Sequence, residues 1–370
     1  MKTQQNIKIQ QQEPKVWPKV AIIILNWNGP KDTIECLESV RQLSYSNYLT
    51  IVVDNGSWDD SVERIKVWVE GNLGEGHALV EYTQATALQG GEEEREDALG
   101  AASPKAKLVL IRNEENLGFT GGNNVAIHYA LQRKLTVDYV FLLSNDAKVA
   151  QDCLQHLVEV ARKANTGIVG AVIKGEDGQI QFAGLNGSFP LVRQFFDPIV
   201  RWPTPPYESE HDFWPSFRVH GATMMVRKDV LRNIYNRTGR YLDNSLFFIY
   251  DEVEFCYVAR KAGYESMIAK HAVVYHKEAG SSGGRYNPIT YYYSNRNRML
   301  LANELLPIYW KMLFHLVNVP LCLGRVLKNL VHRRTSSVRA ILCGLIDGYR
   351  GITGKWKHHD REALGWHRLK

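Results

Sequence analysis

Four short apolar runs, each ended abruptly by polar residues or glycine, constrain the fold of this chain more than any other feature. They are Val20–Leu25, Thr50–Val53, Leu108–Ile111 and Tyr139–Leu143. Apolar runs of this length with polar borders are typical of buried strands, and the sequence between them has the apolar spacing of helices. Strands that alternate with helices form parallel βαβ units. We therefore predict an α/β fold with a doubly wound, mostly parallel sheet and flanking helices.

The residues that follow these strands are the first candidates for a binding site, because the carboxyl ends of parallel strands meet at one edge of the sheet. Asn26 and Asn28 follow the first strand, and Asp54 and Asn55 follow the second. An Asp at such a position can accept a hydrogen bond from a nucleobase N–H, or it can close a simple Asx turn. This edge of the sheet is predicted to bind a ligand.

Asp146 follows the fourth strand, directly after Asn145 and ahead of a predicted helix over Gln151–Lys163. A carboxylate there is placed to hold a divalent cation on a nucleotide diphosphate. The alternative is an Asp in the turn before a helix, which is common. His276 ends a later apolar strand and could supply a nitrogen to Mn²⁺ or Mg²⁺ beside the Asp146 oxygen.

The stretch Asn113–Asn124, NEENLGFTGGNN, combines three glycines with several amides ahead of a predicted helix. Free backbone N–H groups and the positive end of a helix dipole suit such a stretch to a diphosphate. It matches neither the GxGxxG dinucleotide fingerprint nor the GxxxxGK[ST] P-loop. A dinucleotide-dependent dehydrogenase and a P-loop NTPase are therefore disfavoured.

Three acids, Asp251, Glu252 and Glu254, crowd the start of a predicted helix over Asp251–Gly263, directly after the apolar segment LFFIY, which is expected to be a buried strand. Acids in a first turn can simply compensate the helix dipole, at roughly 0.3–1 kcal/mol per charge. Acids beside buried apolar surface can instead have a raised pKa and act as general bases. Asp251 and Glu254 share a helix face and Glu252 points elsewhere, so we expect one acid for catalysis and the others for orientation.

Three segments fall outside the strand and helix pattern. Residues 1–17 are polar, contain no signal peptide and are predicted to form a disordered tail, so that the catalytic domain spans 18–304. Residues 83–107 contain GGEEERED without an apolar period and are predicted to be an exposed insertion. Residues 186–215 are rich in proline and aromatic side chains and are predicted to be a long acceptor-side loop, unless those aromatic rings merely pin it to the surface.

The cysteines are scattered along the chain, at Cys36, Cys153, Cys256, Cys322 and Cys343. None forms a CxxC pair, so neither a zinc site nor a disulfide framework is indicated. We expect buried free thiols, which fits a reducing compartment.

Positive charge is concentrated in the C-terminal part. Residues 311–370 hold 12 Lys and Arg against 3 Asp and Glu, a balance of +9, so with a net charge of +6 the first 310 residues carry −3. A nucleic-acid-binding protein more often carries its positive charge across a folded face, so no nucleic-acid partner is expected. Within Leu305–Val331 the apolar residues have helical spacing, but charges and a proline disfavour a membrane-spanning helix. Residues 305–370 are predicted to form a basic amphipathic extension, either lying on anionic lipid or packed on the catalytic domain.

Taken in order, these segments resemble the family 2 inverting glycosyltransferases with a GT-A fold, and they are most similar to the rhamnosyltransferase-like branch, which uses nucleotide-activated sugars. The similarity covers Val20 to about Leu306 outside the predicted insertion. It is carried by VAIIILNWNG, IVVDNGSWDDS, RNEENLGFTGGNN, FLLSNDAKV, HGATMMVRKDVL, FFIYDEVEFCYVARKAGY and VVYHKEAGSS. The resemblance implies transfer of a sugar, with inversion, from a dTDP-rhamnose-like or UDP-sugar donor to a saccharide or polyprenyl-linked acceptor in cell-surface polysaccharide synthesis.

The resemblance also implies a role for each motif. Asp54 contacts the nucleobase, and the amide and glycine stretch lies near the diphosphate. Asp146 is the last Asp of a DxD-type motif, in which Ser144 replaces an earlier Asp, and His276 completes a site for Mn²⁺ or Mg²⁺. Glu252 is the second acid of an acid-acid-x-acid motif and the expected base, where the family more often has Asp. The predicted site residues are, for the donor, Asn26, Asn28, Asp54, Asn55, Asn116, Gly118, Gly122, Asn123 and Asn145; for catalysis, Glu252, Asp251 and Glu254; for the metal, Asp146 and His276.

Two other classes of function are weighed against this interpretation. A catalytically degenerate scaffold that binds sugar nucleotides is favoured only by the thinned metal motif, and the acidic cluster and His276 argue against it. A nucleotidylyltransferase shares this kind of sheet but usually has a Gly-rich loop with Arg or Lys after the first strand, where this chain has NWNGPKD. The enzyme is expected in the cytoplasm, and at the inner face of the cell membrane if the extension binds lipid.

Overall fold

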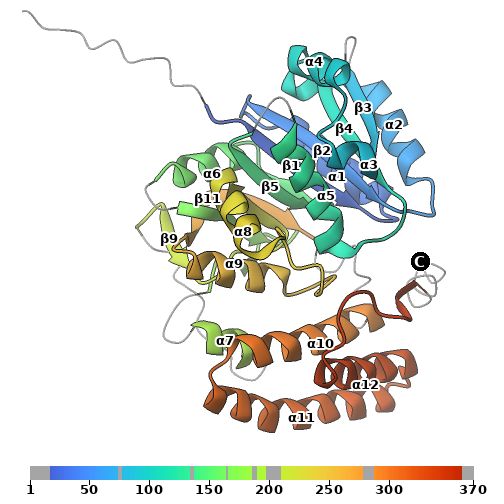
Figure 1. Ribbon diagram of the computed structural model, residues 1–370, viewed down its shortest axis with the longest axis vertical. Helices are drawn as coiled ribbons and strands as arrows, with labels where there is room; N and C mark the ends of the chain where they lie inside the picture. Colours follow the sequence, from blue (N-terminus) through green and yellow to red (C-terminus); the bar gives the residue numbers. More distant parts are fainter. Residues whose placement is uncertain are drawn as a thin grey trace, which may run out of the picture.

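The computed structural model describes residues 17–73, 77–133, 137–163, 166–185, 190–196, 210–277 and 287–360. Helices cover both faces of one large sheet, and the C-terminal helices form a further layer (Figure 1). The strands are β1 (Val20–Asn26), β2 (Tyr48–Asn55), β3 (Ala78–Thr83), β4 (Lys107–Asn113), β5 (Tyr139–Ser144), β6 (Ala147–Val149), β7 (Thr166–Lys174), β8 (Ile180–Phe182), β9 (Phe213–Ser216), β10 (Thr223–Arg227) and β11 (Glu265–His276). The helices are α1 (Pro30–Arg41), α2 (Ser61–Asn72), α3 (Gln84–Leu88), α4 (Glu93–Ala101), the 3₁₀ helix η1 (Pro104–Ala106), α5 (Gly118–Gln132), α6 (Cys153–Ala161), α7 (Pro190–Phe196), α8 (Lys228–Thr238), α9 (Asp251–Lys261), α10 (Pro288–Leu305), α11 (Ile308–Val331) and α12 (Thr335–Tyr349).

The sheet is mostly parallel, which confirms the predicted fold class. Its strands lie in the order β3-β4-β2-β1-β5-β10-β7-β11-β6, with β8 beside β7 and β9 beside β11. The first five strands in this order are parallel, β10 is antiparallel to both of its neighbours, and β11 runs parallel to β7. The register pairs Asn26 with Asp54 and Leu25 with Ser144, so the carboxyl ends of β1, β2 and β5 meet at one edge.

Alternation along the strands builds a core on each face of the sheet. In β1, Ala21 and Ile23 face one apolar cluster, whereas Val20, Ile22 and Ile24 face the other. The first cluster is completed by side chains from α5, α8 and α9, and the second by side chains from α1, α2 and α6. Successive side chains of a strand point to opposite faces, so a strand covered on both sides is apolar throughout. This is why the strands of the sheet appear in the sequence as continuous apolar runs.

Residues 83–107, the predicted exposed insertion, are largely exposed and contain regular secondary structure. They form α3, α4 and η1, next to the edge strand β3, which pairs parallel with β4. The acidic run is held by one buried side chain: Glu96 pairs with Arg133 at 2.6 Å and accepts hydrogen bonds from the hydroxyls of Tyr82 and Tyr129. A composition without an apolar period hides this helix, because a buried ion pair and the single apolar side chain of Leu99 anchor it to the core in place of an apolar stripe.

The short strand β6 was not predicted, and it positions part of the site. It is antiparallel to β11 with Ala147 opposite His276, which brings His276 next to the residue that precedes Ala147 in the chain, Asp146. The helix predicted over Gln151–Lys163 begins at Cys153, after a turn at residues 151 and 152 that follows β6.

The apolar segment before the acidic cluster is a tight turn and not the buried strand that the sequence suggests. Phe247, Ile249 and Tyr250 have φ angles of 63°, 68° and 72°. Positive φ is uncommon for residues other than glycine and is unusual for a β-branched side chain such as Ile249. The backbone of this turn is therefore strained, and it leads directly into α9.

The C-terminal helices begin earlier than predicted, at Pro288, and α10 packs against α12 and lies between α9 and α11 in Figure 1. No helix in the described parts of the chain combines the length and apolarity that crossing a bilayer requires. All five cysteines are free thiols; four are buried, as predicted, and Cys343 is half-buried. Residues 1–16 of the predicted N-terminal tail and most of the predicted acceptor-side loop, 186–189 and 197–209, lie outside the described residues.

Candidate active site

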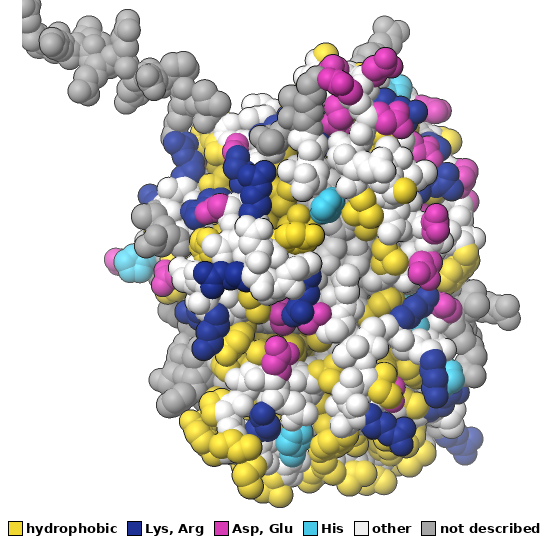
Figure 2. All heavy atoms as spheres, in the orientation of Figure 1, with side chains coloured by type: hydrophobic (Ala, Val, Ile, Leu, Met, Phe, Trp, Pro, Cys, Tyr) yellow, Lys and Arg dark blue, Asp and Glu magenta, His cyan; other side chains and the backbone are white. Residues whose placement is uncertain are grey.

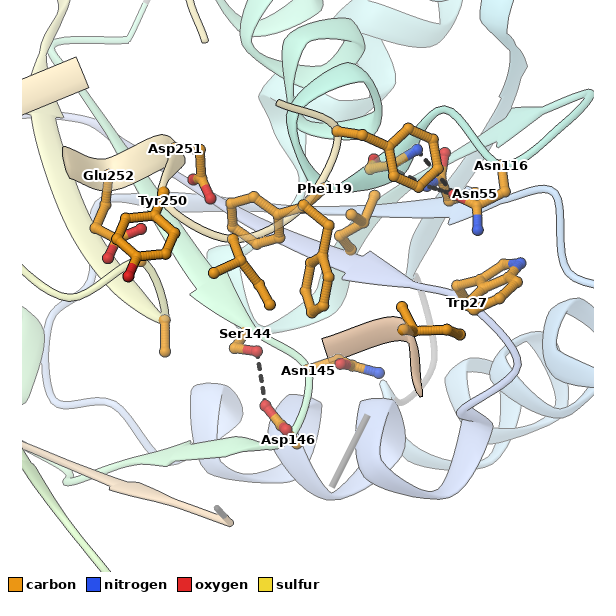
Figure 3. A pocket seen from close by; sticks show the side chains of 18 of the residues that line it. Trp27, Asn55, Asn116, Phe119, Ser144, Asn145, Asp146, Tyr250, Asp251 and Glu252 are labelled. Carbon is orange, nitrogen blue, oxygen red and sulfur yellow. Dashed lines mark hydrogen bonds between the residues drawn. The ribbon is translucent and has the colours of Figure 1, made fainter. Parts of the chain in front are cut away.

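A cavity of about 340 Å³ opens at the edge where β1, β2 and β5 end. This volume is in the range of small-molecule sites. Figure 3 shows two groups on opposite sides of it: Tyr250, Asp251 and Glu252 on one side, and Trp27, Asn55 and Asn116 on the other. The lining residues are Leu25, Trp27, Asn55, Asn116, Gly118, Phe119, Ser144, Asn145, Asp146, His220, Gly221, Ala222, Phe247, Phe248, Ile249, Tyr250, Asp251, Glu252, His276, Asn287, Ile289 and His359.

Two of the three predicted catalytic acids line the cavity. Asp251 is buried, and its Oδ2 atom lacks a hydrogen-bond partner within the described structure. Burial first, and then the charge of Glu252, raise the pKa of Asp251 well above its ordinary value. Glu252 is more accessible, and its Oε1 atom lies 3.3 Å from Nη1 of Arg218. Of this pair, Glu252 is therefore the acid whose carboxylate is paired with a cationic side chain.

Arg218 is itself held in place. Its Nε donates to the Gln194 side chain at 2.8 Å, its Nη1 donates to the Val219 carbonyl at 3.3 Å, and its guanidinium stacks 4.7 Å over the Phe182 ring. The ion pair therefore fixes the direction of the Glu252 carboxylate. No pattern in the sequence indicated Arg218.

Glu254, which was predicted as a catalytic residue sharing a helix face with Asp251, does not line the cavity. It lies 3.0 Å from Arg240 on the buried side of α9. Burial outweighs this neighbour and raises the pKa of Glu254 to about 7. Helix α9 starts at Asp251, so its first two side chains project from the helix end into the cavity, whereas the fourth belongs to a full turn and packs inward.

Asp146 and His276 meet as predicted. His276 Nε2 lies 3.2 Å from Asp146 Oδ1, and the same oxygen accepts a 2.6 Å hydrogen bond from Ser144 Oγ. Ser144, which replaces an acid of the fuller motif, thus orients the remaining one (Figure 3). Within the described ranges, no three His, Cys, Asp or Glu side chains come together in a way that could hold a metal ion.

A second histidine, His220, stands beside this pair and was missed by the sequence analysis. Its ring lies 5.6 Å from that of His276, and its Nδ1 accepts a hydrogen bond from the Ala222 amide at 3.1 Å. Burial, followed by the charge of Arg218, lowers the pKa of His220 to about 3, so the ring is neutral. In the sequence, His220 lies in the segment VHGATMMV. It does not end an apolar run, so the pattern of polar residues at strand ends did not single it out.

The predicted amides form a connected network at the other end of the cavity. Asn55 Nδ2 donates to the Asn116 side chain at 3.0 Å and to the Gly118 carbonyl at 3.1 Å, and Asn55 Oδ1 accepts from Asn113. Gly118 has φ of 76°, and a Cβ there would lie 2.4 Å from the Phe247 carbonyl oxygen. Only glycine fits where this loop meets the strained turn.

Several predicted donor residues brace the cavity without lining it. Asn26 Nδ2 donates to Asp54 Oδ1 at 2.9 Å, Asp54 Oδ2 accepts from the Ser57 amide, and Asn28 Oδ1 accepts from the Trp58 amide. These bonds tie the ends of β1 and β2 together. Both carboxylate oxygens of Asp54 are thus bonded to the protein. The predicted contact of Asp54 with a nucleobase stays a prediction.

Gly122 and Asn123 likewise support the site from within α5. A Cβ at Gly122 would lie 2.5 Å from the Leu25 side chain, so this glycine lets the helix approach β1. Asn123 Nδ2 donates to the Phe119 carbonyl at 2.8 Å and stays inside the helix. Asn145, in contrast, lines the cavity and donates to Thr33 at 3.1 Å.

The C-terminal part supplies lining residues that sequence reasoning missed. Asn287, Ile289 and His359 reach the cavity from around α10 and from beyond α12. The His359 ring lies 5.0 Å from that of Trp27 and 5.3 Å from that of Phe247. These contacts join residues more than one hundred positions apart, which no local pattern reveals.

The sequence is similar to those of known proteins. The model of the family described as "Glycosyl transferase family 2" matches residues 92–235. The low-salt glycan biosynthesis hexosyltransferase Agl10 of Haloferax volcanii is 25% identical over 252 residues, which cover 67% of this chain and 78% of that protein. The uncharacterized protein y4gI of Sinorhizobium fredii is 26% identical over 275 residues, and here the match spans 73% of this chain but only 26% of the longer relative.

Solved structures agree with the fold. The mannosyltransferase PcManGT from Pyrobaculum calidifontis, in complex with GDP-Man and Mn²⁺, superposes with a TM-score of 0.51 at 15% identity, covering 95% of this chain and 81% of that one. S. aureus TarS 1-349 in complex with UDP-GlcNAc gives a TM-score of 0.50 at 14% identity, covering 89% and 81%. At this level of identity the likeness concerns the fold alone.

The fold is thus a GT-A fold, with an acid-bearing cavity at the strand ends. The chain is a glycosyltransferase enzyme, and its residues 92–235 are similar to the family 2 glycosyltransferases. The predicted resemblance to family 2 is confirmed over residues 92–235, whereas the placement in the rhamnosyltransferase-like branch remains a prediction.

Proposed function

We propose that this enzyme transfers a sugar, with inversion, from a nucleotide-diphosphate donor to a hydroxyl of a saccharide or polyprenyl-linked acceptor, with Glu252 as general base. The observation that carries the proposal is the shared cavity: Glu252 lines one side, and Asp146, His276 and the amides Asn55 and Asn116 line the rest. The Agl10 relative is a hexosyltransferase of glycan biosynthesis, which supports a saccharide product for cell-surface polysaccharide synthesis.

The residues that line the cavity indicate how the donor would be oriented in it. Trp27, Asn55 and Asn116 offer an aromatic face and amides for the nucleoside and diphosphate, near the positive end of α5. The sugar then points across the cavity toward Asp251 and Glu252. GDP-Man in PcManGT and UDP-GlcNAc in TarS support a donor of this class.

A divalent cation fits the Asp146–His276 pair. One carboxylate oxygen and one imidazole nitrogen 3.2 Å apart form a donor set that suits Mn²⁺, and two protein ligands leave positions for diphosphate oxygens and water. The Mn²⁺ of PcManGT supports a cation, and Mg²⁺ is the alternative. When bound, the cation would neutralise charge on the leaving diphosphate.

The chemistry assigned to this chain is one displacement. The acceptor hydroxyl gives its proton to the Glu252 carboxylate, and its oxygen forms a bond to the anomeric carbon as the bond from that carbon to the diphosphate oxygen breaks. Arg218 fixes the direction of the base, while the amide loop and α5 face the leaving group. Burial raises the pKa of Asp251, which favours its protonated form, and that form can donate a hydrogen bond to the sugar or acceptor.

We further propose that the C-terminal helices lie on an anionic membrane surface, at the inner face of the cell membrane. Along α11, Ile308, Met312, Leu316, Leu327 and Val331 are 64–80% exposed. Apolar side chains gather with basic ones over the C-terminal helices at the bottom of Figure 2. An exposed apolar helix face bordered by Lys and Arg is suited to an acidic lipid interface, where a polyprenyl-linked acceptor would be held.

A donor screen tests the proposed activity against the scaffold alternative. UDP-glucose, UDP-N-acetylglucosamine, GDP-mannose and dTDP-rhamnose are each incubated with the enzyme and Mn²⁺ or EDTA, and both binding and release of the nucleoside diphosphate are measured. The proposal expects binding and slow release of nucleoside diphosphate with at least one donor, faster with Mn²⁺ than with EDTA. Binding without any release, also in the presence of a short polyprenyl-phosphate saccharide, would support the scaffold instead.

A further inference from the structure

The acids that face the cavity sit at the end of a strained turn. Residues 246–250 contain three non-glycine positions with positive φ, Phe247, Ile249 and Tyr250, and the last of them is the N-cap of α9. Such conformations persist only where the surrounding structure over-determines them. The direction in which Asp251 and Glu252 project therefore depends on whatever holds this turn.

Asn297 of α10 makes the central contact with the turn. It is fully buried, and its side-chain nitrogen lies 3.0, 2.7 and 2.8 Å from the carbonyl oxygens of Leu246, Phe248 and Ile249. The three carbonyl oxygens converge on this one nitrogen, whose two N–H groups are shared among them. One side chain of a distant helix thus closes the hydrogen bonding of the strained segment.

Arg296, the preceding residue, fixes Asn297 and extends the contact. Its Nε donates to Asn297 Oδ1 at 2.8 Å, and its Nη2 donates to the Leu246 carbonyl at 2.8 Å and to the Ser245 carbonyl at 3.3 Å. Its Nη1 donates to the Gly354 carbonyl, which ties the same turn to the C-terminal segment. The guanidinium is fully buried, so its charge is stabilised by these carbonyl dipoles.

An aromatic contact also holds the turn against α10. The Phe247 ring stacks on Tyr293 of α10 with centroids 5.3 Å apart and planes 13° from parallel. On its other side the Phe247 carbonyl borders Gly118 of the amide loop. The turn therefore lies between α10 and the loop that faces the leaving group.

From these contacts we infer that Arg296 and Asn297 are positioning residues for catalysis: they hold the strained turn and so aim Glu252 across the cavity at the donor sugar. The inference rests on the proposed role of Glu252, and neither residue lines the cavity or touches a substrate. Misplacing a base by about 1 Å can lower the rate roughly 100-fold. Loss of the contacts between Arg296, Asn297 and the turn should therefore lower kcat without changing donor binding.

A matched pair of variants separates positioning from simple stability. Asn297→Ala removes the contact, and Asn295→Ala is the control. Asn295 is equally buried on the same helix, but it bonds to Tyr291 and Cys322, away from the turn. Amide hydrogen exchange, melting temperature, donor affinity and kcat with the best donor of the screen are measured for both.

Asn297→Ala is expected to speed exchange of the amides over 247–254 and to lower kcat about 100-fold with little change in donor affinity. Asn295→Ala is expected to lower the melting temperature similarly, with unchanged exchange over 247–254 and nearly unchanged kcat. If Asn297→Ala fails to fold, Asn297→Asp, which keeps the shape and the bond from Arg296 Nε but cannot donate, is measured with the same expectation. A folded Asn297 variant with wild-type kcat, or equal kcat losses in both variants, would overturn the inference.

The double variant Glu252→Gln/Asn297→Ala shows whether the two residues act together. Because Asn297 is inferred to work through Glu252, the double variant should be no slower than Glu252→Gln alone. Additive losses would contradict the inference. If Glu252→Gln alone keeps full activity, the assigned base is wrong, while the exchange measurement still reports on the turn independently.

Discussion

The two ends of the cavity are built in different ways. At the donor end, the amides Asn55, Asn113 and Asn116 bond to one another within the sheet edge, in segments that follow regular strands. At the acid end, Asp251 and Glu252 follow a turn with positive φ angles that is held by a helix about fifty residues later. Under the proposed function, donor binding is local to the sheet edge, whereas the direction of the base depends on the C-terminal helices.

The largest effect is expected from the acid end itself. Glu252→Gln keeps the shape and the contact with Arg218 but removes the proton acceptor, so kcat should fall about 1,000-fold. Donor affinity should change little, because the donor is held at the other end. Turnover and calorimetric titration with the preferred sugar nucleotide check both expectations, and a parallel loss of affinity would mean that the two ends are not separable.

The next effect belongs to the donor end. Asp146→Asn should weaken activity about 100-fold and should also weaken Mn²⁺ binding measured by titration in the presence of UDP. Asp152→Asn is the control, because that side chain is 62% exposed at the start of α6. Unchanged Mn²⁺ affinity in Asp146→Asn would remove this residue from the cation site.

Glu254 tests whether the acid end is divided into a working and a buried side. Its folded-state pKa of about 7 lies above the ordinary 4.5, so the folded protein retains a proton that the unfolded chain releases. Stability relative to Glu254→Gln should therefore fall as pH rises from 4.5 to 7, by up to about 3 kcal/mol. Urea unfolding at pH 5 and pH 8 measures this, and kcat of the variant should stay close to that of the wild type.

The smallest effect concerns the surface of the helices that support the acid end. Leu316→Asp should lower flotation with phosphatidylglycerol-containing vesicles roughly tenfold, because one apolar side chain is lost from the interface. Val67→Asp is the control, since Val67 is 68% exposed on α2, distant from α11 in Figure 1. Equal flotation of wild type and Leu316→Asp would reject α11 as a membrane contact.

The sequence predicted the donor end of the cavity better than the acid end. The strand-end motifs predicted the sheet, its polar edge and the meeting of Asp146 with His276, because each motif follows its own strand. The distinction between residues that line the cavity and residues that brace it was not predictable, since Asn26 and Asn116 have the same kind of side chain at the same kind of position. In the structure, Asn26 bonds to Asp54 and does not line the cavity, whereas Asn116 does.

The acid end was predicted least well, for a physical reason. Its turn looks like a strand because LFFIY is apolar, and its true conformation is fixed by Arg296 and Asn297, which the sequence presents as ordinary polar residues in a helix. His359 reaches the cavity in the same way, across the whole chain. Long-range polar contacts to strained backbone have no periodic signature.

The stereochemistry of the released sugar tests the central claim most directly. A single carboxylate base acting across the cavity requires one displacement, so slow hydrolysis of the preferred donor, followed by proton NMR before mutarotation, should first show the anomer opposite to that in the donor. Initial release of the same anomer would indicate two displacements through an enzyme-bound intermediate and would contradict the role assigned to Glu252.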